Sequence, residues 1–294
     1  MSFDKFLIDA VDEFYSKKVS VMSHNSDDTI DRNVSSVARK WGADLVAVCP
    51  SKSLYYLQGH KSTIKEMMND AKSIVVAAVR MFTSPLECSD RNIRPAQYET
   101  YCLYGVLDKV AFEISRFLDD SGYKAISIPP FLPIKMSWET RGMIADVSLR
   151  HAAEEAGLGR IGLNRLLITK KFGPRVRITG VITDAPLKPN KKLEEEICDK
   201  CGLCLKACPV GAITENGKVD VRKCAPEILK YGLPGMIKFT RQWFKTGEDK
   251  VGEMTKDPVF WELWQTSMLG TFYYCFKCIT SCPIGKRDAK QASA

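Results

Sequence analysis

The chain has 294 residues, of which 45% are hydrophobic, enough for one large core and a smaller appended module. Its net charge of +8 suits an acidic partner, such as a ferredoxin or flavodoxin, or a nucleic acid, and equally an ordinary basic surface. No stretch reaches the roughly 18 continuous apolar residues of a membrane span. The opening MSFDKFLIDAVDEF lacks the features of a signal peptide and contains no twin-arginine pair, so we expect a cytoplasmic protein.

The first region, residues 1–70, is predicted to be mostly helical. Residues 33–41, NVSSVARKW, have helical spacing of apolar side chains, and DLVAVC at 44–49 resembles a short buried strand.

Residues 71–190 predict an α/β core. SIVVAAV at 73–79 is typical of a buried strand, and a long helix is expected over roughly 97–120, ending at Ser121-Gly122. A second helix is expected from about 145 to 156, followed by strands near 165–169 and 176–183. The predicted fold class is α/β (α+β).

Residues 157–162, GLGRIG, match the GxGxxG pattern of dinucleotide sites. Such a site needs a strand before the glycines and a helix after them. Here the helical run LRHAAEEA precedes them and the strand-like run LLIT follows, so nicotinamide binding is not expected. The turn either connects a helix tightly to a strand or lets backbone approach a flat cofactor.

The third region, residues 191–294, contains eight of the eleven cysteines. The first four are spaced C-x2-C-x2-C-x3-C-P, the pattern of bacterial ferredoxins, in which the fourth cysteine binds the other cluster. The last three lack one cysteine, and only Cys224 remains in the region to supply it. An aromatic and basic insert at 225–274 separates the two groups. It could cap the active site, form a dimer contact or rest on a membrane surface, and we expect a helical lid packed on the clusters.

Two 4Fe–4S clusters are therefore predicted, with crossed fourth ligands. We expect cluster one to be bound by Cys198, Cys201, Cys204 and Cys282, and cluster two by Cys208, Cys224, Cys275 and Cys278. The alternative is a pair of four-cysteine zinc sites, which usually use two CxxC pairs separated by a longer loop.

The order of these motifs resembles the cobalamin-dependent iron–sulfur reductases, the superfamily of the reductive dehalogenases and epoxyqueuosine reductases. The resemblance rests on residues 153–190, AEEAGLGRIGLNRLLITKKFGPRVRITGVITDAPLKPN, followed by ICDKCGLCLKACPVGAI. It implies a nitroreductase-like core that holds a base-off corrinoid near the first cluster, with a C-terminal two-cluster ferredoxin-like domain. It also implies that Gly157, Gly159, Arg160 and Asn164 face the corrinoid and that Arg175 lies near the substrate or the cofactor.

A proton donor in such an enzyme needs a hydroxyl or carboxyl group near the reacting centre. The segment in which the family has its tyrosine or aspartate reads LPIKMSWETRGM (132–143), and the nearest carboxyl is Asp146. Tyr101, in a tyrosine stripe with Tyr98 and Tyr104, is a second candidate, although such a stripe is more often core packing. His151 is either a cobalt ligand or a surface histidine.

Three functions fit these patterns. The first is a reductase that passes electrons from an external ferredoxin or flavodoxin through two clusters to cobalamin and a small organic substrate. The second is an electron-transfer protein that reduces a partner corrinoid protein and has no substrate of its own. The third is an epoxyqueuosine reductase-like enzyme acting on tRNA, whose RNA binding would weaken steeply with salt.

Overall fold

The computed structural model describes residues 27–57, 60–61, 63–131, 145–245, 253–270 and 273–286. The expectations for the N-terminal segment before residue 27 and for residues 132–143 lie outside these ranges. Within them, none of the helices combines the length and the apolar character needed to cross a bilayer.

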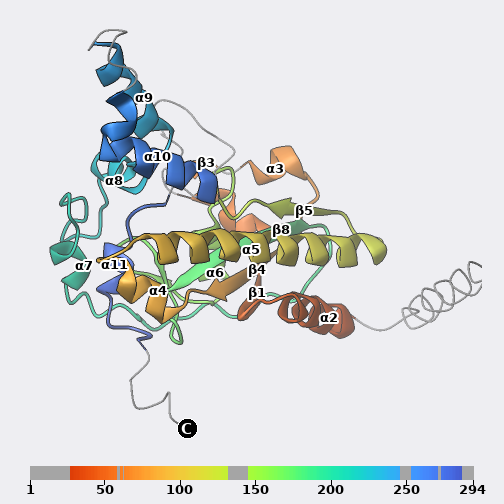
Figure 1. Cartoon of the computed structure of the whole chain (residues 1–294). Coiled ribbons are helices and arrows are strands. Elements are labelled where there is room, and N and C mark those ends of the chain that lie inside the picture. Colours follow the sequence, from red (N-terminus) through yellow and green to blue (C-terminus); the bar gives the residue numbers. More distant parts are fainter. Residues whose placement is uncertain are drawn as a thin grey trace, which may run out of the picture.

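A four-stranded antiparallel sheet forms the centre of the protein (Figure 1). Its order is β1-β4-β8-β5, and the bounds are Leu45–Pro50 for β1, Ser73–Arg80 for β4, Val176–Thr183 for β8 and Ala125–Ile128 for β5. The expected strands at 44–49, 73–79 and 176–183 are confirmed. The short elements η1 (Ser51–Leu54), β2 (Tyr56–Leu57), β3 (His60–Lys61) and α3 (Ile64–Met67) connect β1 to β4.

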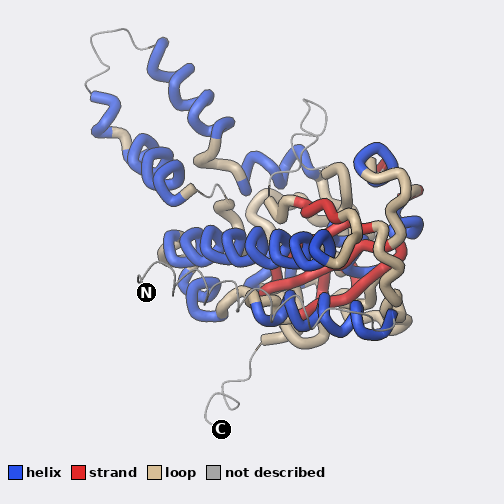
Figure 2. Tube along the Cα trace, turned by 90° about the vertical axis from the view of Figure 1, so that its right-hand side faces the viewer, coloured by secondary structure: helices blue, strands red, loops and turns tan. Residues whose placement is uncertain are grey.

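Helices cover both faces of this sheet (Figure 2). Along β4, Ile74 and Val76 pack in the same core as the residues of α6 (Leu149–Glu155), because alternate side chains of a strand point to opposite faces. Val75 and Ala77 pack in the other core, with α2 (Asp27–Lys40) and α5 (Arg94–Asp120). A strand buried on both faces reads as a continuous apolar run, which is why SIVVAAV shows no alternation.

The long helix α5 begins one turn earlier than expected. Pro95 lies in its first turn, where a proline costs no backbone hydrogen bond, and Ser121-Gly122 ends it as predicted. The preceding helix α4 (Thr83–Cys88) packs against its first half. Together, α4 and α5 form a third apolar cluster with Phe276 and Ile279 of the cysteine-rich region, which joins that region to the core.

The glycine turn connects a helix to a hairpin, as the sequence predicts. Helix α6 is shorter than the expected 145–156, and Gly157 follows it with φ of 74°. The chain then forms the hairpin of β6 (Arg160–Ile161) and β7 (Leu167–Ile168), so the expected strand at 165–169 is only two residues long. Since a helix precedes the glycines, the dinucleotide-binding order is absent from this turn.

The boundary expected near residue 70 does not separate two structural units. Strand β1 pairs along its whole length with β4, from Leu45 opposite Ala78 to Pro50 opposite Ser73. Helix α2 packs on α5 and β1. The described part of residues 1–70 therefore belongs to the α/β core.

The C-terminal region consists of helices joined by loops. It contains α7 (Leu203–Lys206), α8 (Val221–Ile228), α9 (Leu233–Phe244), α10 (Pro258–Leu269) and α11 (Lys277–Thr280). Helices α9 and α10 lie side by side and extend away from the sheet (Figures 1 and 2). The described part of the insert 225–274 is therefore not a lid throughout. Helix α10 is linked to α5 by the ion pair of Arg94 with Glu262, whereas α9 extends away from the sheet (Figure 1).

Candidate iron–sulfur centre and neighbouring polar cluster

Two short helices organise the cysteines. Helix α7 contains Cys204 and packs against α11, which contains Cys278, so the two cysteine motifs lie face to face. Gly202 starts α7 with φ of 75°, a left-handed conformation that glycine adopts without strain. The N–H of Cys201 donates to the Asp199 carboxylate over 3.1 Å, which shapes the preceding turn.

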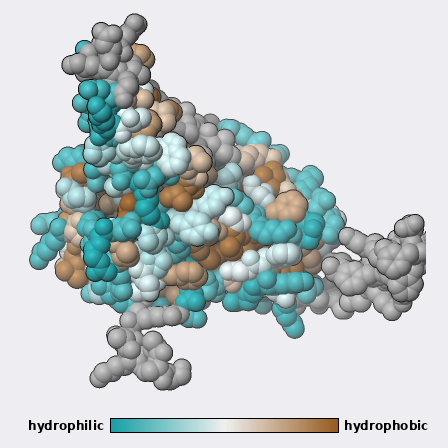
Figure 3. All heavy atoms as spheres, viewed as in Figure 1, coloured by the Kyte–Doolittle hydropathy of each residue, from teal (hydrophilic) through white to brown (hydrophobic). Residues whose placement is uncertain are grey.

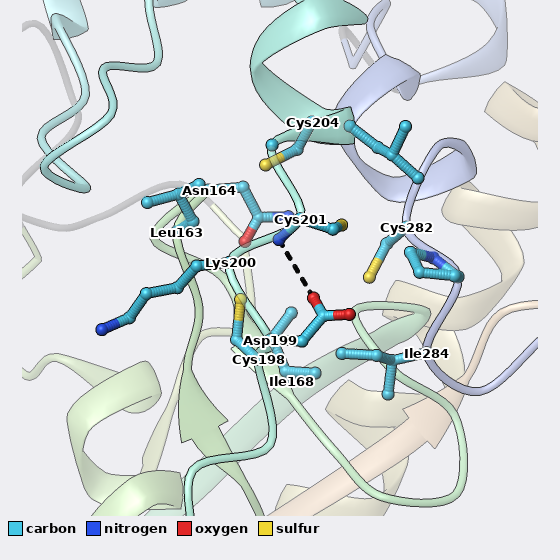
Figure 4. Close-up of a pocket in the computed structure, with 13 residues that line it drawn as sticks. Leu163, Asn164, Ile168, Cys198, Asp199, Lys200, Cys201, Cys204, Cys282 and Ile284 are labelled. Atoms are coloured by element: carbon cyan, nitrogen blue, oxygen red, sulfur yellow. Dashed lines mark hydrogen bonds between the residues drawn. The ribbon is translucent and has the colours of Figure 1, made fainter.

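The first sulfur group consists of Cys198, Cys201, Cys204 and Cys282. These four line one small hollow at the junction of the hairpin, the first cysteine loop and the C-terminal loop (Figure 4). Cys282 comes from a segment almost eighty residues after the other three. The hollow thus collects the set expected for cluster one, including its crossed ligand.

The second sulfur group consists of Cys208, Cys224, Cys275 and Cys278. Burial, helped by the charges of Cys275 and Cys208, raises the pKa of the Cys224 thiol to about 11. Burial and the neighbouring Cys275 and Cys224 likewise raise the pKa of Cys278 to about 12. Because Cys275 and Cys208 both affect the pKa of Cys224 and that of Cys278, the four lie close together, and Cys224, assigned by elimination, is among them. The pKa of Cys278 is also affected by Cys204 of the first group, so the groups adjoin.

Backbone N–H groups point at several of these sulfurs. The N–H of Ala212 donates to the Cys208 sulfur over 3.2 Å, and that of Ile284 lowers the pKa of Cys282, which burial raises. Hydrogen bonds of this kind are among the factors that set cluster potentials. A buried thiol must lose its proton to bind iron, so assembly of a cluster here releases protons.

The zinc alternative requires side chains that converge on a single ion. Within the described ranges, no three histidine, cysteine or carboxylate side chains converge closely enough to bind one metal ion. A tetrahedral zinc site requires four sulfurs at about 2.3 Å from a common ion. In a cubane each thiolate binds a different iron, and the sulfurs stay farther apart.

Arg175 and Asn164 connect the core to the cysteine loops. Arg175 is 4% exposed, and its guanidinium donates to the carbonyl oxygens of Ile284 over 2.8 Å and Cys282 over 2.6 Å. The amide of Asn164 donates to the carbonyl of Cys278 over 3.2 Å. Expected as cofactor contacts, both residues hold the backbone of the second cysteine motif.

The other residues predicted to face a cofactor are also engaged within the chain. Arg160 donates to the carbonyl of Leu193 and to the Glu196 carboxylate. A Cβ on Gly157 would lie 2.2 Å from the Lys191 carbonyl oxygen, and one on Gly159 would lie 2.3 Å from that of Ile168. These glycines allow backbone to approach backbone.

A buried polar cluster beside the second sulfur group was not predicted from the sequence. We define it as Glu99, Tyr104, Arg177 and Tyr273. The Arg177 guanidinium lies 4.4 Å from the centre of the Tyr273 ring, and Cys278 and Tyr104 both contribute to its electrostatic environment. Burial raises the pKa of Tyr104 and of Tyr273. The only hint in the sequence was Tyr104 in the tyrosine stripe.

Several polar atoms of this cluster lack hydrogen-bond partners among the described residues. They are Nε and Nη2 of Arg177 and Oε2 of Glu99. Buried polar atoms are almost always paired, so such atoms mark a place where a polar group is accommodated.

Glu99 gives a testable pH dependence. Burial raises the pKa of its carboxyl to about 7, although the N–H of Phe82 and the charge of Arg177 oppose this. The folded state then binds more protons than the unfolded state between about pH 4.5 and 7, so this group lowers stability as the pH rises through that range. Above pH 7 the penalty is on the order of 3 kcal/mol.

We therefore expect Glu99→Gln to raise the thermal unfolding temperature at pH 8.5 and to change it little at pH 5. The matched control is Glu215→Gln, an exposed carboxyl in a turn, which should be neutral at both pH values. Differential scanning calorimetry measures the effect. An equal gain at both pH values would contradict it.

The predicted proton donors lie away from these groups or give no sign of the role. Tyr101 is 53% exposed on α5, with its ring next to Gly270 at the end of α10. The carbonyl of Asp146 accepts hydrogen bonds from Thr63 just before α6. His151 Nδ1 lies 2.6 Å from the hydroxyl of Ser148 within the first turn of α6.

Comparison with known proteins agrees with the motif resemblance. Residues 192–214 match the 4Fe-4S binding domain. The chain is 28% identical over 191 residues to epoxyqueuosine reductase of Gloeobacter violaceus, a match that covers 64% of this chain and 55% of that protein. It is 40% identical over 116 residues to tetrachloroethene reductive dehalogenase of Desulfitobacterium hafniense, covering 38% of this chain and 18% of that protein. The matches span about half or less of these relatives.

Solved structures of both kinds of protein share the fold. A selenomethionine-labelled epoxyqueuosine reductase superposes with a TM-score of 0.54 at 20% identity, covering 88% of this chain and 66% of that one. A catabolic reductive dehalogenase in complex with 3-bromo-4-hydroxybenzoic acid superposes with a TM-score of 0.59 at 18% identity, covering 88% and 32%. The expected mixed α/β core with a ferredoxin-like C-terminal region is confirmed.

Proposed function

We propose that this protein is an iron–sulfur reductase in which two 4Fe–4S clusters pass electrons toward a corrinoid bound beside the α/β core. The observation that supports it best is the sorting of eight cysteines, from segments far apart in the sequence, into two adjoining groups of four. A lone carrier would need the clusters but not the buried polar cluster next to them.

The two cluster sites fit their expected cofactors through eight thiols and several N–H···S contacts. For a corrinoid, the residues that fit are those of the buried polar cluster, which lies beside the second sulfur group and not, as the resemblance implied, near the first. Arg177 and Glu99 present unpartnered polar atoms there, and a corrinoid carries many amide groups. A bound corrinoid would supply a cobalt centre that relays electrons to substrate. Arg177 would orient polar substituents, and Tyr104 and Tyr273 would hold protons on their hydroxyls, since burial keeps both neutral.

The substrate is either a small organic molecule, as in the dehalogenases, or a modified nucleotide in tRNA. The stretch FGPRVRITGVITDAPL, which resembles the dehalogenases, favours a small organic substrate. The longer matches to epoxyqueuosine reductases favour a modified nucleotide to the same degree. A cytoplasmic location suits the tRNA function.

The test starts with anaerobic reconstitution of the full chain with iron and sulfide. About eight irons per chain are expected. After incubation with hydroxocobalamin, gel filtration should leave the corrinoid on the protein with a base-off spectrum. Retention of iron and sulfide alone would support the carrier function, and bound zinc with little iron would refute the proposal.

Turnover then separates the two substrate classes. With excess reductant, the loaded protein is offered 3-bromo-4-hydroxybenzoic acid and an epoxyqueuosine-modified tRNA stem loop in parallel. Release of bromide assigns the first class, and conversion to queuosine assigns the second.

A further inference from the structure

The two sulfur groups differ in their access to solvent. In the first group, Cys201 is exposed at the surface, and Leu203 next to it is 42% exposed. In the second group all four cysteines are half-buried, and Cys278 packs against the apolar cluster that α4 and α5 form. Electron transfer between proteins falls off with distance, so the exposed Cys201 marks an edge of the first group where an external carrier can approach.

The surface at this edge is basic. Lys200 lies on the rim of the hollow and points away from the sulfurs (Figure 4), and Lys206 is the last residue of α7. Lys286 follows the loop of Cys282. All three are exposed, and none forms an ion pair with another described residue.

The acids nearby do not cancel this charge. Glu194, Glu195 and Glu196 are paired with Lys191, Lys170 and Arg160 respectively. Asp199 is exposed, and its carboxylate accepts the N–H of Cys201. Lys200 and Asp199 thus lie with Leu203 and Pro283 at the rim of the hollow, and the adjoining segments add the exposed Lys206 and Lys286.

We propose that this surface, defined as Lys200, Leu203, Lys206, Pro283 and Lys286, docks a small acidic one-electron carrier protein of the ferredoxin or flavodoxin class. The carrier is oxidised by one electron and the first cluster is reduced by one, and the electron then passes to the second cluster. Lysines around an apolar centre fit a carrier with carboxylates around its own redox group, because complementary charge speeds the encounter. The inference rests on the proposed function, since it needs both clusters.

The test uses stopped-flow reduction of the reconstituted chain by photoreduced flavodoxin, followed as bleaching of cluster absorbance. At low ionic strength, Lys200→Glu/Lys206→Glu should slow this reduction roughly tenfold or more. The rate for the unmodified chain should fall as salt is added, and the double variant should lose that dependence. Reduction by the small cationic radical of methyl viologen should not slow.

The matched control reverses two lysines elsewhere. Lys40→Glu/Lys188→Glu has the same change in net charge, and both residues lie by α2, at the opposite end of the molecule from α7 (Figure 1). Equal slowing in this control, or salt-independent reduction of the unmodified chain, overturns the docking surface. So does loss of tRNA binding in the Lys200 and Lys206 variant with unchanged flavodoxin kinetics, which would assign the lysines to RNA.

Two measurements keep this outcome separate from the proposed function. If the unmodified chain holds about eight irons and is reduced by methyl viologen, the clusters are present and only the docking surface is in question. If it holds few irons, the proposed function itself fails. If the double variant loses iron, its kinetics no longer test the docking surface. The salt dependence of the reduction of the unmodified chain by flavodoxin is then the test.

Discussion

Cys278→Ala is expected to remove one cluster and to leave the other. Its thiol lies in the second sulfur group, with the charges of Cys275, Cys224 and Cys208 around it. Loss of one thiolate from a buried site should lower the iron content from about eight to about four per chain. The first sulfur group keeps all four of its cysteines, so half of the cluster absorbance should remain and still bleach with reductant.

Turnover should fall by at least about 10²-fold in this variant, because the electron path to the polar cluster is interrupted. Reduction of the first cluster by an external carrier should continue. Electron paramagnetic resonance of the reduced protein should change from the spectrum of two interacting clusters to that of an isolated one.

Cys282→Ala is the informative partner of this variant. Cys282 lies only four residues further on, yet the structure places it with Cys198 and Cys201 in the first group. The substitution Cys282→Ala should therefore remove the first cluster and leave the second. Cys102→Ala, an exposed cysteine on α5, should leave the iron content unchanged. If Cys278 and Cys282 variants lost the same cluster, the crossed assignment would be wrong.

Gly173→Ala should produce the largest loss of stability among the glycine positions. Gly173 has φ of 56°, and a Cβ there would lie 1.9 Å from the carbonyl oxygen of Ile284. In the opposite direction, a Cβ on Gly285 would lie 2.2 Å from the N of Gly173. The backbone of the core therefore crosses the backbone of the loop after Cys282 in direct contact. No movement of a single side chain would relieve the clash.

We expect a cost of about 3 kcal/mol or more, since backbone displacement adds to the strain of a left-handed alanine. Thermal unfolding should occur roughly 6–10 °C lower. Because Arg175 holds the same loop through Cys282 and Ile284, the first cluster should also be lost more readily to a chelator.

The control for this experiment is Gly105→Ala. Gly105 is an exposed residue of α5 with no atom within 4 Å of the position of an added Cβ. Alanine there should stabilise the helix by about 0.5–1 kcal/mol. If the two variants had similar stability, the proposed crossing of backbones at Gly173 would be contradicted.

The outer surface of the protein carries exposed apolar side chains. Figure 3 shows apolar patches over the middle of the face that α5 crosses, below the projecting α9 and α10. Tyr98 and Tyr101 of α5 and Trp264 and Met268 of α10 are among the exposed large apolar residues. Tyr101, expected as a proton donor, thus belongs to the outer surface.

Some elements follow directly from local sequence. Strand β4 was predictable because seven consecutive apolar or small residues can be buried on both faces of a sheet. Helix α5 was predictable from its apolar spacing and from the glycine after it. The eight cluster cysteines were predictable because iron–sulfur ligation needs thiolates at short, fixed spacings.

The roles of single residues were harder to predict. Arg160 lies in the glycine turn and Arg175 directly before β8, which suggested cofactor contacts. Both nevertheless bind elements distant in the sequence, residues 193–196 and the loop of Cys282. Glu99, Arg177 and Tyr273 come from α5, β8 and the segment before Cys275, and no local pattern links them.

What the sequence determined by itself was therefore the chemistry: the number of thiolates, their pairing into two sets, and the order of helix, glycine turn and strand. These depend on spacings of a few residues, which local geometry constrains. Only the tertiary structure decided which side chains face each other across segments, that the glycines serve crossing backbones, and that Cys201 of the first sulfur group is exposed while the cysteines of the second are half-buried. Burial and contact between distant segments depend on packing of the whole chain, which short-range patterns do not encode.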